Sequence, residues 1–379
     1  MQCHHFDAGR CRSCTHLPVP YADQVARAQA AAQAVLADVV PAPVWEPPTT
    51  SREAGFRTKA KMVVAGRAGE PTLGILGPDG AGVDLRDCPL YSSAMQAVLA
   101  GVADLVARLR LTPYDVPARV GELKHVLVTE SPDGEFLVRF VLRSRDELPR
   151  LRAALPELQR ELPQVRVVTA NLQPVHQAIL EGPEEDVLTP VATLPMDLGA
   201  VRLHLGPRSF FQTNTDVARA LYAAAVDWTR DLAPRTVLDL YCGVGGFALH
   251  LAGALPEARV HGVEVSVDAV HAARRSAAEA GLVATFAAAD ATDPAAVGPD
   301  ALDVDLLVVN PPRRGIGDDL AAAIAASPAR AVLYSSCHPG SLARDLAVLT
   351  GAGFTARRAR LLDMFPHTDH AEVLVLLQR

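Results

Sequence analysis

The chain has 379 residues, of which 49% are hydrophobic and 21% are charged, and its formal net charge is −7. This length is large for one hydrophobic core, so we expect two or three domains of an ordinary globular protein. The acidic balance excludes a basic field over the whole surface, and no apolar run is long enough to cross a membrane. No leader of the secretory type opens the chain, so we expect a cytoplasmic protein, and nothing in the sequence requires more than a monomer.

The first fourteen residues are rich in cysteine. Cys3, Cys11 and Cys14 lie in a stretch predicted to be an irregular loop, and Cys88 follows much later. Four thiolates are enough to close a metal site, and two residues between Cys11 and Cys14 let both thiols face one metal. Zinc and an iron–sulfur cluster both accept four cysteines, and spacing alone does not separate them. The alternative, that these are small buried apolar residues, is weak for three thiols in a polar loop.

Hydrophobic periodicity and turn residues divide the next part of the chain into short elements. In chain order they are a helix at 21–39, a proline-rich linker at 40–50, short strands within 55–91, a helix at 92–110, a hairpin of 122–130 and 135–143, a helix at 146–162, and strands at 165–172 and 176–180. We therefore assign 1–91 to an N-terminal region that contains the four cysteines of the candidate metal site, and 92–200 to a central α+β domain.

Residues 237–251 combine a short apolar strand, a glycine-rich turn and a helix. The strand contains Asp239, and the turn contains Gly243, Gly245 and Gly246. Glycines at such a turn let the backbone approach a ligand closely, and the helix that follows presents unpaired N–H groups. The spacing is not the G-x-G-x-x-G of dinucleotide-binding domains, so the pattern favours a different adenosine-bearing cofactor over NAD.

Four polar side chains stand where four successive apolar strands end. They are Tyr241, Glu264, Asp290 and Asn310. In doubly wound sheets ligands bind at the carboxyl ends of the strands, where an acid after the second strand can accept hydrogen bonds from ribose hydroxyls. Either acid alone would be interpreted as a helix N-cap. Four polar side chains at the ends of four strands favour a ligand-binding site instead. The layout of 201–379 resembles a Rossmann-like class I S-adenosylmethionine-dependent methyltransferase domain.

A further strand, 331–337, ends in Cys337, at the same edge of the predicted sheet. Carbon-5 of a pyrimidine is a poor nucleophile until another group adds to carbon-6. A thiolate adding at carbon-6 activates carbon-5 toward a methyl donor, and a carboxylate must then remove the carbon-5 proton so that the thiol can leave. Cys337 and Glu372 are the candidates for these roles. The alternative is a buried strand cysteine and an unrelated surface glutamate.

The segment Asn310-Pro311-Pro312-Arg313 raises a rival chemistry. Methyltransferases that act on exocyclic amino groups use Asn- or Asp-Pro-Pro followed by an aromatic residue that stacks on a flipped base. Arg313 takes the aromatic position here, which argues against amino-group methylation, although a guanidinium can also stack on a base.

Taken together and in order, these motifs resemble those of the RNA uracil-C5 methyltransferases, and most closely the branch that acts on 23S rRNA. The motifs that carry the resemblance, which extends over essentially the whole chain, are the N-terminal cysteines, 56–62, 209–214, 239–246, 310–317, 334–337 and 363–368. Two departures from many relatives, the lack of an N-terminal oligonucleotide-binding barrel and Asn310 in place of Asp, are shared with the 23S branch. Tyr241 replaces the phenylalanine common at its position.

The resemblance implies roles for particular residues. It implies a [4Fe-4S] cluster on Cys3, Cys11, Cys14 and Cys88, which we interpret as structural because the methyl-transfer chemistry does not need it. It places Gln212, Tyr241, Glu264 and Asn310 at S-adenosylmethionine, with Asp290 near the adenine. It makes Cys337 the carbon-6 nucleophile and Glu372 the general base.

The expected partner is RNA, with 23S rRNA favoured over tRNA, whose uridine methyltransferases share these motifs. Candidate phosphate contacts are Arg57, Lys59, Lys61 and the central arginines Arg139, Arg143 and Arg145. Two other hypotheses are kept: amino-methylation of adenine or guanine, which predicts activity without Cys337, and a non-catalytic iron–sulfur RNA-binding protein, which predicts no binding of S-adenosylmethionine.

Overall fold

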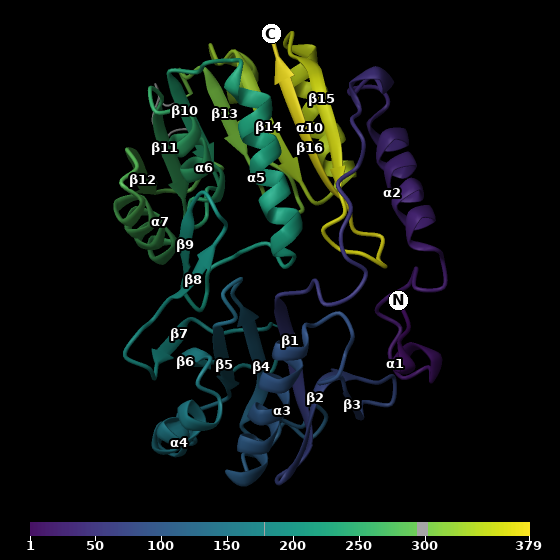
Figure 1. The fold of residues 1–379 in the computed structure, drawn as a ribbon, viewed down its shortest axis with the longest axis vertical. Coiled ribbons are helices and arrows are strands. Elements are labelled where there is room, and N and C mark those ends of the chain that lie inside the picture. The colour runs from purple at the N-terminus through teal and green to yellow at the C-terminus, as the bar shows by residue number, and fades with distance from the viewer. Residues whose placement is uncertain (178, 294–301) are drawn as a thin grey trace. The chain divides into compact units, whose positions relative to one another are not determined.

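The computed structural model describes residues 1–177, 179–293 and 302–379, and its internal contacts divide the chain into two compact units. The first unit contains Met1–Cys14 and Glu53–Met196, and the second contains Thr15–Arg52 and Asp197–Arg379. Each unit is built on a seven-stranded sheet with helices (Figure 1). The sheet of the first unit is antiparallel except between β5 (Phe136–Leu142) and β6 (Val165–Leu172), whereas that of the second is mainly parallel. A separate pair of strands, β8 (Leu194–Asp197) and β9 (Arg202–Leu205), lies where the chain passes from one unit to the next.

The sheet of the first unit has the strand order β3-β2-β1-β4-β5-β6-β7. Its elements are α1 (His4–Asp7), β1 (Lys59–Arg67), β2 (Glu70–Leu76), β3 (Gly82–Asp84), α3 (Ser93–Arg108), β4 (Leu123–Glu130), β5 (Phe136–Leu142), α4 (Leu148–Glu161), β6 (Val165–Leu172) and β7 (Glu184–Val187). Alternate residues such as Met62, Val126 and Phe140 are fully or almost fully buried in one core with the apolar faces of α3 and α4. The strands that we treated as two regions of the sequence therefore share one sheet.

Two sequence-based predictions in this unit are wrong. The stretch at 176–180 is not a strand in its described residues, while residue 178 lies outside the described part; the last strand is β7 instead. Asn171 explains why the last strand lies at β7. Its side-chain amide is hydrogen-bonded to the N–H and the C=O of Gly182 and to the C=O of Glu184. These bonds bring the chain back beside β6 two residues before β7 begins to pair. The N-terminal cysteine loop also contains one helical turn, α1.

The sheet of the second unit has the order β12-β11-β10-β13-β14-β16-β15, parallel except at β16, which runs antiparallel to both of its neighbours (Figure 1). Its elements are α2 (Tyr21–Leu36), η1 (Ala42–Val44), α5 (Thr215–Arg230), β10 (Thr236–Leu240), α6 (Gly246–Ala254), β11 (Arg259–Glu264), α7 (Val267–Ala280), β12 (Ala284–Ala288), β13 (Leu306–Val309), α9 (Asp318–Ala326), β14 (Ala331–Ser336), α10 (Pro339–Gly351), β15 (Thr355–Leu362) and β16 (Glu372–Gln378). The predicted Rossmann-like sheet is confirmed.

One face of this sheet packs on α2, α9 and α10, while α5, α6 and α7 pack on the other. Helix α2 was expected with the N-terminal region, but it belongs to the second unit, where Leu36 is completely buried in the core. The chain after α2 forms isolated bridges from Trp45 and Thr49 to β15, which extends the sheet at that edge. Within the described residues, none of the helices combines the length and the apolarity needed to span a bilayer.

Candidate active site

The carboxyl ends of the parallel strands of the second unit border a cavity of about 650 Å³. All seven residues predicted for cofactor binding and catalysis line it: Gln212, Tyr241, Glu264, Asp290, Asn310, Cys337 and Glu372. They come from segments up to 160 residues apart. Tyr241, Glu264, Asp290, Asn310 and Cys337 meet because parallel strands end at the same edge, whereas Gln212 precedes α5 and Glu372 begins the antiparallel strand β16.

The glycine turn between β10 and α6 shapes one wall of the cavity. Gly245 has φ +89°, a left-handed conformation that disfavours side chains, and it caps α6. A Cβ on Gly246 would lie 2.4 Å from the Tyr222 hydroxyl, so α5 and the start of α6 pack closely only because no side chain is present. Asp239, completely buried below the turn, accepts a 2.9 Å hydrogen bond from the Ala248 N–H, and burial raises the pKa of its carboxyl to about 8.

Glu264, the last residue of β11, is hydrogen-bonded to the glycine turn between β10 and α6. Its two oxygens accept hydrogen bonds from the Gly243 N–H at 3.1 Å and the Ser266 N–H at 3.0 Å. An ionised carboxylate offers about four lone-pair sites, so two remain for hydroxyl donors in the cavity. Asp290, after β12, is exposed and accepts from the backbone and side chain of Thr292, and these bonds lower the pKa of its carboxyl.

Tyr241 is the residue that turns the chain away from β10. Its φ of +62° is unusual for a non-glycine residue, and such backbone conformations concentrate at functional sites. Its hydroxyl is buried without a hydrogen-bond partner in the described part of the chain, and burial raises the pKa of the phenol to about 12. The ring therefore contributes an apolar surface to the cavity wall.

Cys337 and Glu372, the two residues predicted to be catalytic, line the same cavity. Burial, and then the nearby Glu372 carboxylate, raise the pKa of the half-buried Cys337 thiol, while Arg313 opposes that shift. Glu372 is only 2% exposed at the start of β16, and burial raises the pKa of its carboxyl to about 7. A group with this pKa can accept a proton at neutral pH and release it again, as a general base must.

Asp345 of α10 holds the loop 310–317 in place, and sequence reasoning did not identify it. Its buried carboxylate accepts hydrogen bonds from the Tyr334 hydroxyl at 2.5 Å and from the Ile316 N–H at 2.9 Å. A Cβ at Gly315, where φ is +86°, would lie 2.3 Å from the same carboxylate. The loop that carries Asn310 and Arg313 is thus tied to the strand that leads to Cys337. An acid on the buried face of an amphipathic helix is the one signal that marks it in the sequence.

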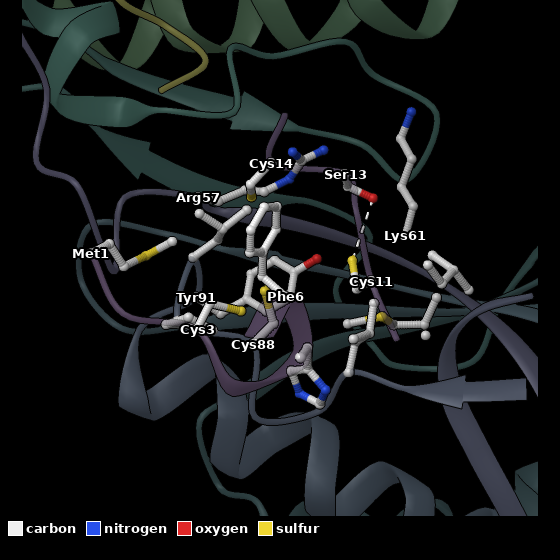
Figure 2. A pocket seen from close by; sticks show the side chains of 17 residues that line it. Met1, Cys3, Phe6, Cys11, Ser13, Cys14, Arg57, Lys61, Cys88 and Tyr91 are labelled. Carbon is white, nitrogen blue, oxygen red and sulfur yellow. Dashed lines mark hydrogen bonds between the residues drawn. The ribbon is translucent and has the colours of Figure 1, made fainter. Parts of the chain in front are cut away.

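The first unit holds a second cavity, of about 230 Å³, lined by Cys3, Cys11, Cys14 and Cys88. Figure 2 shows the four thiols around it, with Arg57 and Tyr91 nearby, and with Cys11 Sγ 3.5 Å from Ser13 Oγ. All four cysteines are free. The loop before α1, the turn after it and the segment after β3 supply these four cysteines.

The thiols are spaced more widely than a single ion requires. Four thiolates at about 2.3 Å from one zinc ion lie less than about 4 Å from one another. Among the described residues, the donor atoms that converge to within 4.8 Å in a group of three belong to His4, His5 and Asp87, and no set of three cysteines does so. His5 Nε2 and His4 Nε2 lie 2.6 and 3.1 Å from the Asp87 carboxylate, a contact that joins α1 to the segment carrying Cys88.

The surroundings oppose ionisation of the thiols when no cation is bound. Burial and the other cysteines raise the pKa of Cys14 to about 11, and burial raises that of Cys88 to about 12. A positively charged group among the four sulfurs would reverse this balance, since metal binding requires and stabilises thiolates. Four thiols in this cavity are therefore a donor set that a bound metal centre would stabilise as thiolates.

The three central arginines that were predicted to contact phosphate differ in their exposure and in their ion pairs. The prediction for Arg139 is wrong, because this side chain is 1% exposed and its guanidinium is held by Glu181 and Glu185. Arg143 pairs with Glu122, and Arg145 pairs with Glu184 and Asp186, although both remain partly exposed.

The basic residues near the cysteine cavity are more available to a partner. Lys61 is exposed on β1, and Arg57 and Lys61 both line the cavity. Lys59 is largely shielded from water, and burial together with the nearby Lys61 lowers the pKa of its ammonium to about 8. Of the predicted cationic residues around this cavity, Lys61 presents the most accessible charge.

The fold and the cavity define a methyltransferase of the Rossmann-like class. Residues 201–334 match the family described as methyltransferase small domain, and residues 296–379 match the tRNA (uracil-5-)-methyltransferase family. The fold is also that of the tRNA (uracil-54, C5)-methyltransferase of Pyrococcus abyssi, solved with S-adenosyl-L-homocysteine. The TM-score is 0.78 at 21% identity, over 96% of this chain and 85% of that one.

Curated relatives narrow the class. The chain is 46% identical over 381 residues to the 23S rRNA (uracil(747)-C(5))-methyltransferase of Shewanella loihica, covering 100% of this chain and 99% of the relative. It is 48% identical over 383 residues to the enzyme of the same description from Halothiobacillus neapolitanus, covering 100% of both. The chain belongs to the RNA uracil-C5 methyltransferases, in the 23S rRNA branch.

Proposed function

We propose that this protein methylates carbon-5 of a uridine in 23S rRNA, with S-adenosylmethionine as the methyl donor. The observation that carries the proposal is the single cavity that combines an adenosine-type site at the strand ends with Cys337 and Glu372. Full-length relatives described as 23S rRNA uracil-C5 methyltransferases support the choice of substrate. Membership of the family argues against both amino-methylation and a non-catalytic role.

The residues at the strand ends suit S-adenosylmethionine. Glu264 has lone pairs left for the ribose hydroxyls, and Asp290 is exposed at the next strand end, near the expected adenine position. Gln212 and Asn310 add polar side chains, and the Tyr241 ring adds an apolar wall. When bound, S-adenosylmethionine supplies an electrophilic methyl group.

In the proposed mechanism the Cys337 thiolate adds to carbon-6 of a uracil that has left its stack, and the electron pair of the 5,6-double bond moves toward carbon-5 and oxygen-4. Arg313, the cationic side chain that lowers the pKa of the Cys337 thiol, favours the thiolate. After carbon-5 has been methylated, Glu372 removes its proton. The double bond re-forms, and the electrons of the carbon–sulfur bond return to Cys337.

The test uses RNA from a strain that lacks the enzyme. Purified protein and S-adenosylmethionine labelled in the methyl group should transfer label to 23S rRNA and not to tRNA. In 23S rRNA carrying tritium at carbon-5 of uridine, each methyl transferred should release one tritium into water. Label in tRNA would move the substrate to the other branch of the family. Methylation without tritium release would place the methyl group on a different atom and refute the mechanism.

We further propose that Cys3, Cys11, Cys14 and Cys88 hold a [4Fe-4S] cluster with a structural role. The proposal is supported by the four cysteines that line one cavity of about 230 Å³, and by the resemblance, which implies such a cluster on these residues. The cavity belongs to the first unit, whereas Cys337 and Glu372 belong to the second. The structural role is proposed because the methyl-transfer steps described above need no metal centre.

Anaerobically purified protein should contain about four iron and four sulfide per chain and absorb broadly near 400 nm, which are the properties of such a cluster. Cys14→Ser should remove most of the iron, while Cys242→Ser, a change of a buried cysteine of the second unit, should not. One zinc per chain and no sulfide would overturn the cluster in favour of a mononuclear site.

A further inference from the structure

A buried serine is hydrogen-bonded to the carboxylate of Glu372. Ser335, on the neighbouring strand β14, donates a hydrogen bond from Oγ to Glu372 Oε1 at 2.5 Å. Ser335 is 0% exposed and Glu372 is 2% exposed, so both groups are removed from water. The two strands are antiparallel neighbours with Ser335 opposite Leu374, which fixes the serine beside the glutamate whatever the cavity contains.

Ser335 is the one hydrogen-bond donor to Glu372 within the part of the chain that the structure describes. The ionisable groups around the carboxylate come from several elements. Cys337 follows β14 and Tyr222 belongs to α5. Burial raises the pKa of both the thiol and the phenol, and the charge of Glu372 adds to both shifts. Arg313, which follows β13, lines the same cavity. On its other side, Glu372 is paired with the apolar Leu362 of β15. None of these groups replaces the serine as a donor.

We propose that Ser335 is a positioning residue for the proton-abstraction step: it keeps Glu372 ionised and fixed by Oε1, which leaves Oε2 to take the carbon-5 proton. The proposal rests on the proposed function, because it assigns Ser335 a role in a step that Glu372 performs. It separates the two halves of the reaction. Methyl transfer depends on Cys337, whereas release of the product depends on the Ser335–Glu372 pair.

The chemistry of the release step shows what the hydrogen bond contributes. Oε2 accepts the proton of carbon-5, the electron pair of that carbon–hydrogen bond forms the 5,6-double bond, and the carbon–sulfur pair leaves with Cys337 as a thiolate. A protonated Glu372 cannot perform this step. A buried carboxyl without a donor takes up a proton, and a hydrogen bond to the charged form opposes that uptake. Burial raises the pKa of Glu372 and Ser335 lowers it, so removing the hydroxyl should raise it further.

The experiment follows the covalent intermediate in Ser335→Ala. The enzyme is mixed with 23S rRNA and methyl-labelled S-adenosylmethionine, quenched at intervals and run on a denaturing gel, between about pH 6 and 9. The rate at which free methylated RNA appears, divided by the amount of methylated protein–RNA adduct present, gives the rate constant of release separately from that of methyl transfer. In Ser335→Ala we expect the adduct to accumulate at neutral pH. We also expect the acidic limb of the pH profile of the release rate to move to higher pH. A move of one pH unit corresponds to about tenfold slower release on the acidic side.

Two further variants serve as controls: one tests whether the loss of any buried serine has the same effect, and the other tests whether Glu372 is the base. Ser276→Ala removes another buried serine of the same unit, whose hydroxyl donates to the Ala272 C=O at 2.9 Å in α7, and its release profile should match that of the unmodified enzyme. Glu372→Gln should accumulate adduct at every pH. Absence of adduct in Glu372→Gln would overturn the base itself and the role of Ser335 with it.

Adduct in Glu372→Gln together with an unshifted profile in Ser335→Ala would overturn the serine alone. Binding of S-adenosylmethionine to each variant shows that the second unit is folded, so a loss of release cannot be mistaken for unfolding.

Discussion

Arg139, a buried basic residue of the first unit, gives the sharpest test of whether a predicted phosphate contact stabilises the fold instead. Arg139 donates from Nε to Glu185 at 2.8 and 2.9 Å, and its remaining nitrogens contact Glu185 and Glu181. Glu185 also accepts from Thr169 Oγ1 at 2.6 Å and from Asn171 Nδ2 at 2.8 Å. Arg139→Met keeps much of the length of the side chain and removes its charge and donors.

Removing one partner from a buried pair leaves the other charge uncompensated, which costs about 3 to 5 kcal/mol. At about 2 to 4 °C per kcal/mol for a unit of this size, the melting temperature of the first unit should fall by roughly 6 to 20 °C. Adding Glu185→Gln should recover part of the loss, since the uncompensated carboxylate is then gone. Arg145→Met, which breaks a more exposed pair, should lower the stability far less than Arg139→Met does.

Thermal unfolding of the full chain, followed by circular dichroism, measures the stability of these variants. Binding of 23S rRNA at several salt concentrations measures the alternative, because loss of a phosphate contact weakens binding and flattens its salt dependence. An Arg139→Met protein that melts like Arg145→Met but binds RNA with a flatter salt slope would refute the structural role of Arg139 and restore the phosphate contact suggested by the sequence.

Two further changes test the interior of the second unit. The pKa of Asp239 is raised to about 8 in the folded state, so between about pH 4 and 8 the folded chain binds more protons than the unfolded one and this group lowers stability as pH rises. The melting temperature of the unmodified protein should therefore fall relative to that of Asp239→Asn between pH 5 and 8, and a constant difference would contradict the raised pKa. Asp345→Ala leaves the Tyr334 hydroxyl and the Ile316 N–H without an acceptor, at about 1 to 3 kcal/mol each. It should lower both the melting temperature and the yield of covalent RNA adduct, and Tyr334→Phe should restore part of the stability; full adduct formation in Asp345→Ala would show that loop 310–317 does not need this anchor.

The sequence was sufficient to predict the edge of the sheet where the site lies. The continuous apolar runs of the strands and the glycine turn after β10 indicate parallel strands. Parallel strands end at the same edge, so Tyr241, Glu264, Asp290 and Asn310 were expected to meet. Cys337 could be placed with them for the same reason. The role expected of Glu372 came from chemistry and from the resemblance to a family, since periodicity says nothing about which acid faces a thiol.

The remaining features depend on contacts between distant segments. Ser335 looks like an ordinary residue of a buried strand until β16 is seen to run antiparallel beside it. Arg139 reads as one of many arginines because its partners, Glu181 and Glu185, follow more than 40 residues later. Helix α2 has an amphipathic pattern that predicts a helix correctly, but the pattern does not say which of two cores receives its apolar face.

The central claim is that Cys337 forms a covalent bond with carbon-6 of a uridine that is then methylated at carbon-5. It is tested most directly by mixing the protein with S-adenosylmethionine and 23S rRNA fragments in which uridine is replaced by 5-fluorouridine. Fluorine cannot be removed as a proton, so the methylated adduct should persist on a denaturing gel, and Cys337→Ala should abolish it. An adduct that survives in Cys337→Ala, or no adduct with any fragment although the protein binds S-adenosylmethionine, would contradict the claim.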